Sequence, residues 1–291
     1  MVTILTPTYN RCKLLPALYE SLKRQTSKNF EWLIVDDGSS DDTKKLVETL
    51  KDSEEDFKIK YVYKENGGKH TALNIGFDCC EGELTAIVDS DDYLVDNAVE
   101  TIEKYWAKYS SDVSLCGLVF LREDKDGNIT GQKFPGDEYR SNYIDCRINE
   151  GIKGDKFEVF RTEHLKQYRF PVFKGERFIG ESVVWGKMAE KYDMIHINVP
   201  LYVCEYHEGG LSRSGRKLRM KCPLGGREYA KTFLTDKVRF IKRVKFMLLY
   251  IVYSRQAGMT NKAAKKEIKY KFLYDVCKIP AFFIRKRWNK A

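Results

Sequence analysis

The N-terminal part of the chain alternates between short apolar stretches and longer segments with helical spacing. The predicted strands are residues 2–6, 30–35, 58–63 and 84–88, and the predicted helices are residues 14–24, 42–50, 71–79 and 97–109. In the first helix, for example, apolar side chains recur at Leu14, Leu15, Leu18 and Leu22. Strands joined by helices of this length form βαβ units, so the pattern predicts an α/β fold with a mainly parallel sheet.

The second half of the chain is less regular. The elements predicted there are a strand at 113–121, a turn at 124–128, a returning strand at 129–134, a helix at 181–192 and a strand at 194–206 that Pro200 interrupts. Between them, the polar, glycine-containing residues 135–155 predict a loop that faces a substrate.

Polar clusters follow three of the predicted strands. Their sequences are TPTYNR at 6–11, DDGSSDD at 36–42 and DSDD at 89–92. Parallel sheets bind ligands beyond the carboxyl ends of their strands, so we expect the three clusters to meet at one edge of the sheet.

The last cluster, Asp89, Ser90, Asp91 and Asp92, delivers several carboxylates to the end of a buried strand. Neighbouring carboxylates repel one another, and burial increases that cost unless a cation is present. Mg2+ or Mn2+ would relieve it and would also grip a phosphate. The alternative is a solvated loop in which an Asp caps a helix, and for Asp92 we prefer this cap.

Composition limits the class of protein. With 291 residues, 43% of them hydrophobic, the chain forms one large domain or one domain with an extension. The N-terminus reads directly as a strand without a signal-peptide pattern, and no apolar run approaches the roughly 20 residues that span a bilayer. Eight scattered cysteines without metal-binding spacing predict reduced thiols in a cytosolic protein and no structural zinc site.

The net charge of +9 is unevenly distributed. Residues 213–291 hold 23 Lys and Arg against 4 Asp and Glu, whereas residues 1–212 hold 28 against 38. An acidic body with a basic tail predicts an anionic partner, which is a phosphate, a nucleic acid or an anionic membrane surface.

The tail also has amphipathic spacing. Residues 237–253 place apolar side chains on one face and basic side chains on the others, and the apolar residues 279–284 precede Arg285-Lys286-Arg287-Trp288. Two interpretations stand: helices that lie on an anionic bilayer, or helices that pack their apolar faces on the main domain. We therefore divide the chain into a domain at 1–220 and a basic helical extension at 221–291.

Taken together, the motifs resemble the family 2 glycosyltransferases, which have a GT-A fold. In order along the chain, they are TPTYNR at 6–11, VDDGSSDDT at 35–43, NGGKHTALN at 66–74, VDSDD at 88–92 and FIGESVVW at 178–185. The resemblance spans roughly residues 1–215, and within the family the chain is similar to bacterial enzymes that build surface polysaccharides.

The resemblance implies a nucleotide site. Pro7 and Tyr9 would form a wall for a uracil-sized ring, and Asp36 would accept a hydrogen bond from the ring N–H; Tyr9 is otherwise a core aromatic. Asp89 would approach the ribose, and Asp91 would hold a metal that bridges the diphosphate. The other residues expected in the nucleotide site are Asn10, Arg11, Asp37, Lys69 and Ser90.

The resemblance also implies a catalytic base and a mobile loop. Glu181 would deprotonate the acceptor hydroxyl and so invert the anomeric centre, unless it is an ordinary Glu at a helix N-terminus. His207 is either a further metal ligand or a surface residue. Side chains expected over the diphosphate are Arg213, Arg216 and Lys217, and acceptor candidates are Asp155, Lys156 and Trp185, of which Asp155 and Lys156 equally suit a surface turn.

The chain departs from the family pattern at Ala72-Leu73-Asn74, where an Arg is common at the middle position. Lys69 or His70 would supply the missing cation. The position after Glu181 is Ser182 rather than a second carboxylate, which makes Glu181 the sole candidate for the base.

We predict an inverting, Mn2+- or Mg2+-dependent glycosyltransferase of the hexosyltransferase type. It would move a sugar from a UDP-sugar to a lipid-linked or oligosaccharide acceptor, as a peripheral protein on the cytoplasmic face of the membrane. The alternatives are a sugar-phosphate nucleotidyltransferase, disfavoured because the loop at 6–11 lacks glycine, and a nucleic-acid-binding protein, disfavoured because the tail has apolar faces and no known motif.

Overall fold

The structure, a computed structural model, describes residues 1–204 and 215–289. Of residues 215 and 216, it describes the backbone only. The described chain forms two compact units that are interleaved in sequence. The first consists of residues 1–142, 152–169 and 191–204, and the second of residues 143–151, 170–190 and 215–289. This division differs from the predicted boundary at residue 220 between a domain and a basic helical extension, and that boundary stays a prediction.

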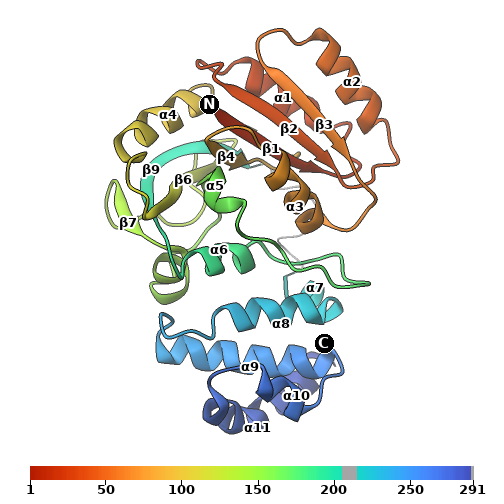
Figure 1. The fold of residues 1–291 in the computed structure, drawn as a ribbon, viewed down its shortest axis with the longest axis vertical. Coiled ribbons are helices and arrows are strands. Elements are labelled where there is room, and N and C mark those ends of the chain that lie inside the picture. Colours follow the sequence, from red (N-terminus) through yellow and green to blue (C-terminus); the bar gives the residue numbers. More distant parts are fainter. Residues whose placement is uncertain (205–214, 290–291) are drawn as a thin grey trace. The chain divides into compact units, whose positions relative to one another are not determined.

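The first unit is built on one mixed sheet with the order β3-β2-β1-β4-β8-β6-β9-β5, in which β7 also pairs with β9 (Figure 1). Its strands are β1 (Val2–Thr8), β2 (Phe30–Asp36), β3 (Lys58–Tyr63), β4 (Leu84–Ile87), β5 (Tyr93–Leu94), β6 (Leu115–Asp124), β7 (Tyr139–Ser141), β8 (Lys156–Arg161) and β9 (Asp193–Cys204). Strands β5, β7 and β8 run opposite to the other six. The predicted α/β fold with a mostly parallel sheet is therefore confirmed.

Helices cover both faces of this sheet, and β1 and β2 are therefore buried on both sides. On one face, α1 (Leu15–Lys23), α2 (Thr43–Ser53) and α4 (Ala98–Tyr109) share a core with the strands. On the other face lies α3 (Lys69–Cys79), where a Cβ on Gly76 would come within 2.5 Å of Leu5. The short helix α5 (Thr162–Leu165) follows β8.

The region after β6 corrects three predictions. The returning strand at 129–134 is wrong, since Ile129 makes only an isolated bridge to Glu123, and β6 pairs with β8 instead. The polar insert at 135–155 contains β7 and the π-helix η1 (Ile144–Asn149) rather than a plain loop. Pro200 does not interrupt β9, because shifts in the β6–β9 register absorb it.

The second unit is helical. Besides η1, it contains α6 (Ser182–Met188), α7 (Gly215–Lys221), α8 (Pro223–Thr232), α9 (Phe240–Gln256), α10 (Asn261–Lys266) and α11 (Lys271–Trp288). Helix α9 packs against both α8 and α11, and buries Phe246, Met247, Tyr250 and Ile251 (Figure 1). The apolar face of α9 is thus covered by other helices of the tail, and the predicted packing of the tail on the main domain stays a prediction. Within the described residues, no helix is long and apolar enough to cross a membrane.

Candidate functional site

The three polar clusters meet at one edge of the sheet. Thr8 and Asp36 are neighbours in the β1–β2 register, and the main-chain N–H of Val88 donates to the carbonyl of Leu5 at 3.0 Å. Parallel pairing of β1 with β2 and β4 therefore brings the carboxyl ends of these strands together, as the sequence predicts.

Asn10 ties the first two clusters to each other. Its main-chain N–H donates to Ser39 Oγ at 2.8 Å, and its side-chain Oδ1 accepts from the N–H of Ser40 at 2.8 Å. Asn10 has a φ of 53°, a left-handed conformation that Asn tolerates better than most residues. Next to it, the side chain of Tyr9 is 46% exposed, so the core interpretation of Tyr9 is wrong and its ring is open to a ligand.

Asp36 is fully buried at the end of β2. Its Oδ1 accepts from the N–H of Ser39 at 2.7 Å, and its Oδ2 accepts from the hydroxyl of Tyr61 at 2.6 Å. Burial, and then the Asp36 carboxylate, raise the pKa of Tyr61, which stays a proton donor. A carboxylate has about four lone-pair sites, so these two bonds leave acceptor capacity on Asp36.

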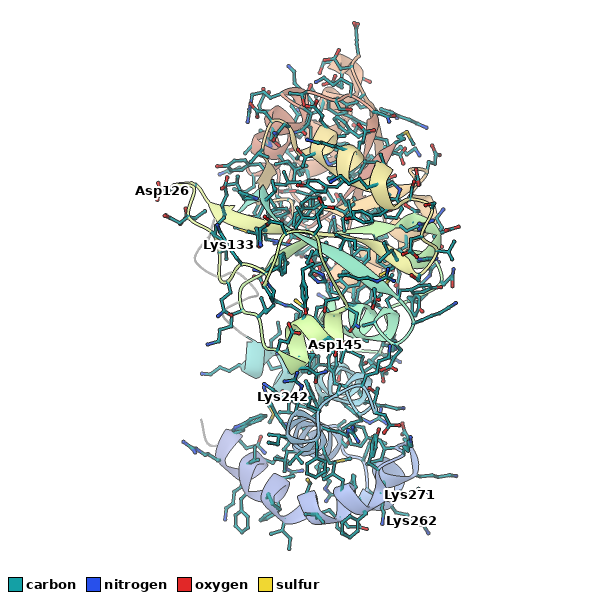
Figure 2. The ribbon with its side chains drawn as sticks, turned by 90° about the vertical axis from the view of Figure 1, so that its left-hand side faces the viewer. Asp126, Lys133, Asp145, Lys242, Lys262 and Lys271 are labelled. Atoms are coloured by element: carbon teal, nitrogen blue, oxygen red, sulfur yellow. The ribbon has the colours of Figure 1, made fainter. Side chains whose placement is uncertain are left out.

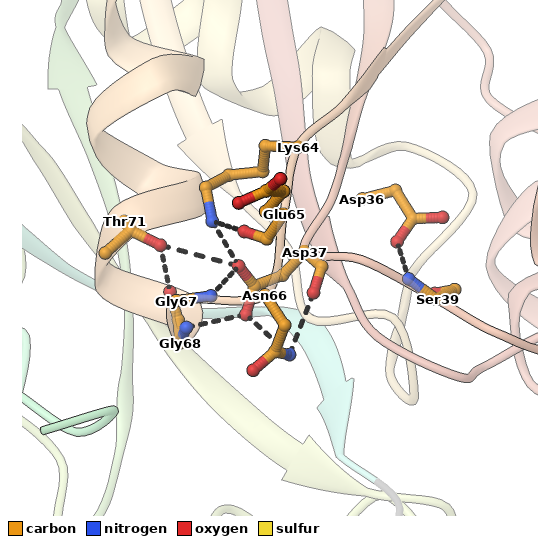
Figure 3. A network of polar contacts seen from close by, with 9 residues as sticks. All are labelled: Asp36, Asp37, Ser39, Lys64, Glu65, Asn66, Gly67, Gly68 and Thr71. Carbon is orange, nitrogen blue, oxygen red and sulfur yellow. Dashed lines mark hydrogen bonds and ion pairs between the residues drawn. The ribbon is translucent and has the colours of Figure 1, made fainter. Parts of the chain in front are cut away.

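Asp37 serves the loop that leads into α3 (Figure 3). Its carboxylate accepts from Lys64 Nζ at 2.6 Å and from the main-chain N–H groups of Gly67 at 2.9 Å and Gly68 at 2.7 Å. Its main-chain carbonyl accepts from Asn66 Nδ2 at 2.8 Å, and its side chain is 5% exposed. Asp37 therefore holds the loop that positions Lys69, and its expected contact with a nucleotide stays a prediction.

Cations lie beside both predicted ligand carboxylates, Asp89 and Asp91, of the cluster at 89–92, which we call the acidic run. Lys69 forms an ion pair with Asp89, and Arg11 Nη2 lies 3.9 Å from Asp91 Oδ2. Burial alone would raise the pKa of Asp89, but the charges of Lys69, Arg122 and Arg11 outweigh it and hold that pKa below its ordinary value. The side chains of Asp89 and Asp91 remain 30% and 29% exposed, so both carboxylates are open to a ligand.

Of the two residues proposed to replace the missing Arg, Lys69 is the one that meets the acidic run. His70 is buried, and burial lowers the pKa of its imidazole, which favours the neutral form. Ser90, the remaining residue of the predicted nucleotide set on this strand end, is buried as well, and so is Pro7 at the end of β1.

Tyr202 on β9 lies beneath the acidic run. Its buried hydroxyl accepts from the N–H of Asp89 at 3.0 Å and donates to Asp92 Oδ2 at 2.7 Å. The guanidinium of Arg122 stacks 4.0 Å from the Tyr202 ring, and its Nε donates to the carbonyl of Lys156 at 2.7 Å. The helix-cap prediction for Asp92 is wrong, because α4 begins at Ala98 and Asp92 instead binds this tyrosine.

Sequence reasoning missed Tyr202 and Arg122. The signal available was that each carries a polar group on an otherwise apolar strand, in the sequences LVFLR and PLYVC. Nothing local shows that β6 pairs with β9, or that β9 pairs with β5 and so brings Tyr202 to the acidic run.

The donor set suits a hard divalent cation. Carboxylate oxygens are the ligands that Mg2+ and Mn2+ prefer, and the partly exposed Asp91 supplies them. In the part of the chain that the structure describes, no group of three or more His, Cys, Asp or Glu side chains would hold a metal alone. Phosphate and water oxygens would therefore have to complete the coordination, as is usual for Mg2+. His207 lies outside the described residues.

Glu181 belongs to the second unit and directly precedes α6. Its main-chain carbonyl accepts from the N–H groups of Val184 at 2.9 Å and Trp185 at 3.1 Å, and its side chain is half-buried. Trp185 is buried edge-on to Phe170, with 6.1 Å between ring centroids. In this unit Lys217 is exposed on α7, the backbone of residue 216 lies in the same helix, and Arg213 lies outside the described residues.

The acceptor candidates of the first unit differ in exposure. Asp155 is exposed just before β8. Lys156 is buried, and its ammonium donates to the carbonyl of Gln132 at 2.6 Å, so it serves the fold at this position.

Comparisons with known proteins agree with this architecture. The family described as Glycosyl transferase family 2 matches residues 3–174. A curated protein of Campylobacter jejuni, named GalNAc(5)-diNAcBac-PP-undecaprenol beta-1,3-glucosyltransferase, is 29% identical over 284 residues, which is 94% of this chain and 85% of that protein.

Solved structures share the fold. Residues 1–349 of TarS from S. aureus, in complex with UDP, superpose with a TM-score of 0.62 at 18% identity, over 99% of this chain and 91% of that one. The mannosyltransferase PcManGT from Pyrobaculum calidifontis, in complex with GDP-Man and Mn2+, gives 0.59 at 18% identity, over 100% and 88%. Since the family match covers more than half of the sequence, the chain belongs to glycosyl transferase family 2 and is a glycosyltransferase with a GT-A-like fold.

Proposed function

We propose that the enzyme transfers a sugar from a UDP-sugar, with inversion, to a lipid-linked or oligosaccharide acceptor during the assembly of a bacterial surface polysaccharide. The observation that carries this proposal is the edge where Tyr9, Asp36, Asp89 and Asp91 converge. The similar TarS structure holds UDP, and the similar Campylobacter protein is named for an undecaprenol-linked acceptor.

The residues of this edge divide the donor between them. Tyr9 and Pro7 stack on the base, and Asp36 accepts from its ring N–H through the acceptor capacity that Ser39 and Tyr61 leave. Asp89 and Ser90 lie toward the ribose. Lys69 and Arg11 are the cations nearest the acidic run, so they attract the diphosphate.

Asp91 would hold Mn2+ or Mg2+, and His207 is the candidate for a further ligand. When bound, such a cation neutralises charge on the diphosphate. The similar PcManGT structure contains Mn2+. Asp91 has open oxygens for this role because Arg11 approaches it only to 3.9 Å.

Glu181 takes the proton of the acceptor hydroxyl, which then attacks the anomeric carbon from the face opposite the leaving diphosphate. Arg213, Arg216 and Lys217 are the candidates to bind the diphosphate, and of the three acceptor candidates Asp155 is exposed whereas Lys156 and Trp185 are buried. We place the enzyme on the cytoplasmic face of the membrane as a peripheral protein, because its basic helices suit anionic lipid headgroups.

The test is the thermal stability of the purified full chain with UDP, GDP, TDP and CDP, each with and without Mn2+. We expect UDP to stabilise the protein, more strongly with the metal, and we expect Asp91→Ala to lose the metal-dependent part. Asp126→Ala, which removes an exposed turn carboxylate of the same unit, is the matched control. The proposal fails if no nucleoside diphosphate shifts the unfolding of protein shown to be folded.

A further inference from the structure

Helix α11 carries an apolar stripe that faces solvent. Phe272, Val276, Ile279 and Phe283 are 83%, 57%, 71% and 63% exposed. They are spaced three or four positions apart, so they form one continuous line along the helix. A line of four large apolar side chains is unusual on a free surface and marks a contact with another apolar phase.

The opposite face of α11 is already used. Tyr274, Cys277 and Ala281 are buried in the core of the second unit. At the end of the helix, Arg285 Nη1 donates to the carbonyl of Arg255 at 3.0 Å, and the Trp288 ring lies 6.2 Å from that of Tyr253. These contacts fix α11 on α9, so the exposed stripe points away from the unit's core.

Figure 2 shows α11 as the outermost helix of this unit, with side chains projecting from the side turned away from α9. Lys271 at its start and Lys262 on α10 both extend outward there. The side of α11 turned away from α9 is therefore an outer surface of the unit.

Charge identifies the partner. Helix α11 has five basic residues against one acidic residue, Asp275, which is paired with Lys265 at 2.5 Å and Lys278 at 3.1 Å. Lys286 and Arg287 are exposed, and helical geometry places them on the two sides of the stripe. An apolar stripe rimmed by long basic side chains fits an anionic lipid surface, where the stems lie in the interface and the charges meet headgroups.

Two other occupants fit less well. A second copy of this chain, paired about a twofold axis, would bring the same basic rims against each other, and like charges repel. A bilayer span does not fit, because no helix within the described residues is long and apolar enough.

We propose that α11 lies in the interface of an anionic bilayer with Phe272, Val276, Ile279 and Phe283 inserted among the lipids. The inference rests on the membrane location in the proposed function and deepens it, because it names one helix face instead of the basic tail as a whole. Phe282, 61% exposed beside the stripe, would sit at the boundary of the inserted region.

The experiment is sedimentation of the full chain with vesicles of phosphatidylcholine alone and vesicles that also contain phosphatidylglycerol. We expect binding to the anionic vesicles only. Phe272→Glu/Phe283→Glu should weaken that binding at least about tenfold, because each phenylalanine loses its apolar burial and a negative charge enters an anionic surface. Lys286→Gln/Arg287→Gln should weaken it too and should reduce its salt dependence.

The matched control is Val113→Glu/Val172→Glu, which makes the same charge change at valines that are 74% and 62% exposed elsewhere. It should bind vesicles like the wild type. Equal binding of the Phe272/Phe283 variant and the wild type would overturn the proposal, and so would absence of wild-type binding. A dimer in gel filtration that the Phe272/Phe283 variant abolishes would assign the stripe to a second copy.

UDP-dependent thermal stabilisation, measured on the same preparations, separates this inference from the proposed reaction. The variants of α11 should keep that stabilisation, because they change no residue of the nucleotide site. Loss of vesicle binding with intact nucleotide binding supports the proposal that α11 binds the membrane. Vesicle binding by a protein that no nucleotide stabilises would contradict the proposed donor but not the membrane contact of α11.

Discussion

The hydroxyl of Tyr202 lies 2.7 Å from Asp92 Oδ2, and the same oxygen accepts from the main chain of the acidic run. One buried tyrosine on β9 thus holds both ends of a loop whose carboxylates Asp89 and Asp91 stay partly exposed. The shape of the candidate metal and ribose site depends on this contact as well as on the carboxylates themselves.

Tyr202→Phe should destabilise the protein by about 1–3 kcal/mol, because the buried Asp92 carboxylate and the N–H of Asp89 each lose their hydrogen bond to the tyrosine hydroxyl. It should also weaken UDP binding by loosening the acidic run. Urea unfolding and UDP titration measure the two effects. Tyr250→Phe deletes a similarly buried hydroxyl, 2.9 Å from the carbonyl of Ala264, and should lower stability without changing UDP binding. Equal UDP affinity in both variants would contradict the positioning role.

Lys69→Met should make the protein less stable near neutral pH and less sensitive to acid. The pKa of Asp89 in the folded protein lies below its ordinary value, so ionised Asp89 stabilises the fold above that value, and this is lost as pH falls through the folded pKa. Without Lys69, burial meets less opposing charge and the pKa of Asp89 rises. The stability that ionised Asp89 adds near neutral pH then shrinks, so the fall in thermal stability between about pH 7 and pH 3 should be smaller than in the wild type.

Lys44→Met is the control for this series, because Lys44 pairs with the exposed Glu48 at 3.8 Å, away from the acidic run. Its acid profile should match that of the wild type. Superimposable profiles for the Lys69 variant and the wild type would show that the ion pair with Asp89 does not contribute to stability in solution.

Asp37→Asn should unfold far more easily than the wild type, by about 3–5 kcal/mol, as expected when a buried ion pair loses one partner. The new amide would also point a donor at N–H groups of the loop before α3. Chemical denaturation measures the loss, and Asp126→Asn on the exposed turn is the control. Normal stability combined with weaker UDP binding would return Asp37 to the nucleotide, the role predicted from the sequence.

Glu181→Gln should lower sugar transfer by about 10²–10⁴ while leaving UDP-dependent stabilisation unchanged, because a general base acts on the acceptor and not on the donor. Glu190→Gln, an exposed carboxylate just after α6, should be fully active. Comparison of turnover and UDP affinity in the two variants checks the assignment, and a fully active Glu181 variant would exclude it as the base.

The N-terminal half of the fold could be predicted because local sequence decides it. Strand β3 spans the predicted residues, and β1 and β2 end within two residues of their predicted ends. The agreement arises because short apolar runs bounded by polar clusters predict strands. The acidic run was placed at the correct edge for the same reason. Parallel pairing of these strands then follows, because the connections between them are long enough to hold a helix.

The centre of the chain could not be predicted, because long-range pairing decides it. Strand β8 begins with the buried Lys156 directly after a polar stretch, and its place between β4 and β6 is set by long-range pairing. Pro200 should end a strand by its local chemistry, yet a register shift against Leu121 accommodates it. The roles of Tyr202 and Arg122 depend on that same pairing, so the sequence around each residue does not reveal them.

The interleaving of the two units has a consequence for synthesis on the ribosome. Strand β5 is made early, but its partner β9 follows two segments that belong to the other unit. At roughly 5–20 residues per second, β5 waits on the order of 5–20 s with an unpaired edge before β9 is translated. During that interval the nascent chain is exposed to misfolding and proteolysis, and a slow-down in translation before β9 would lengthen it.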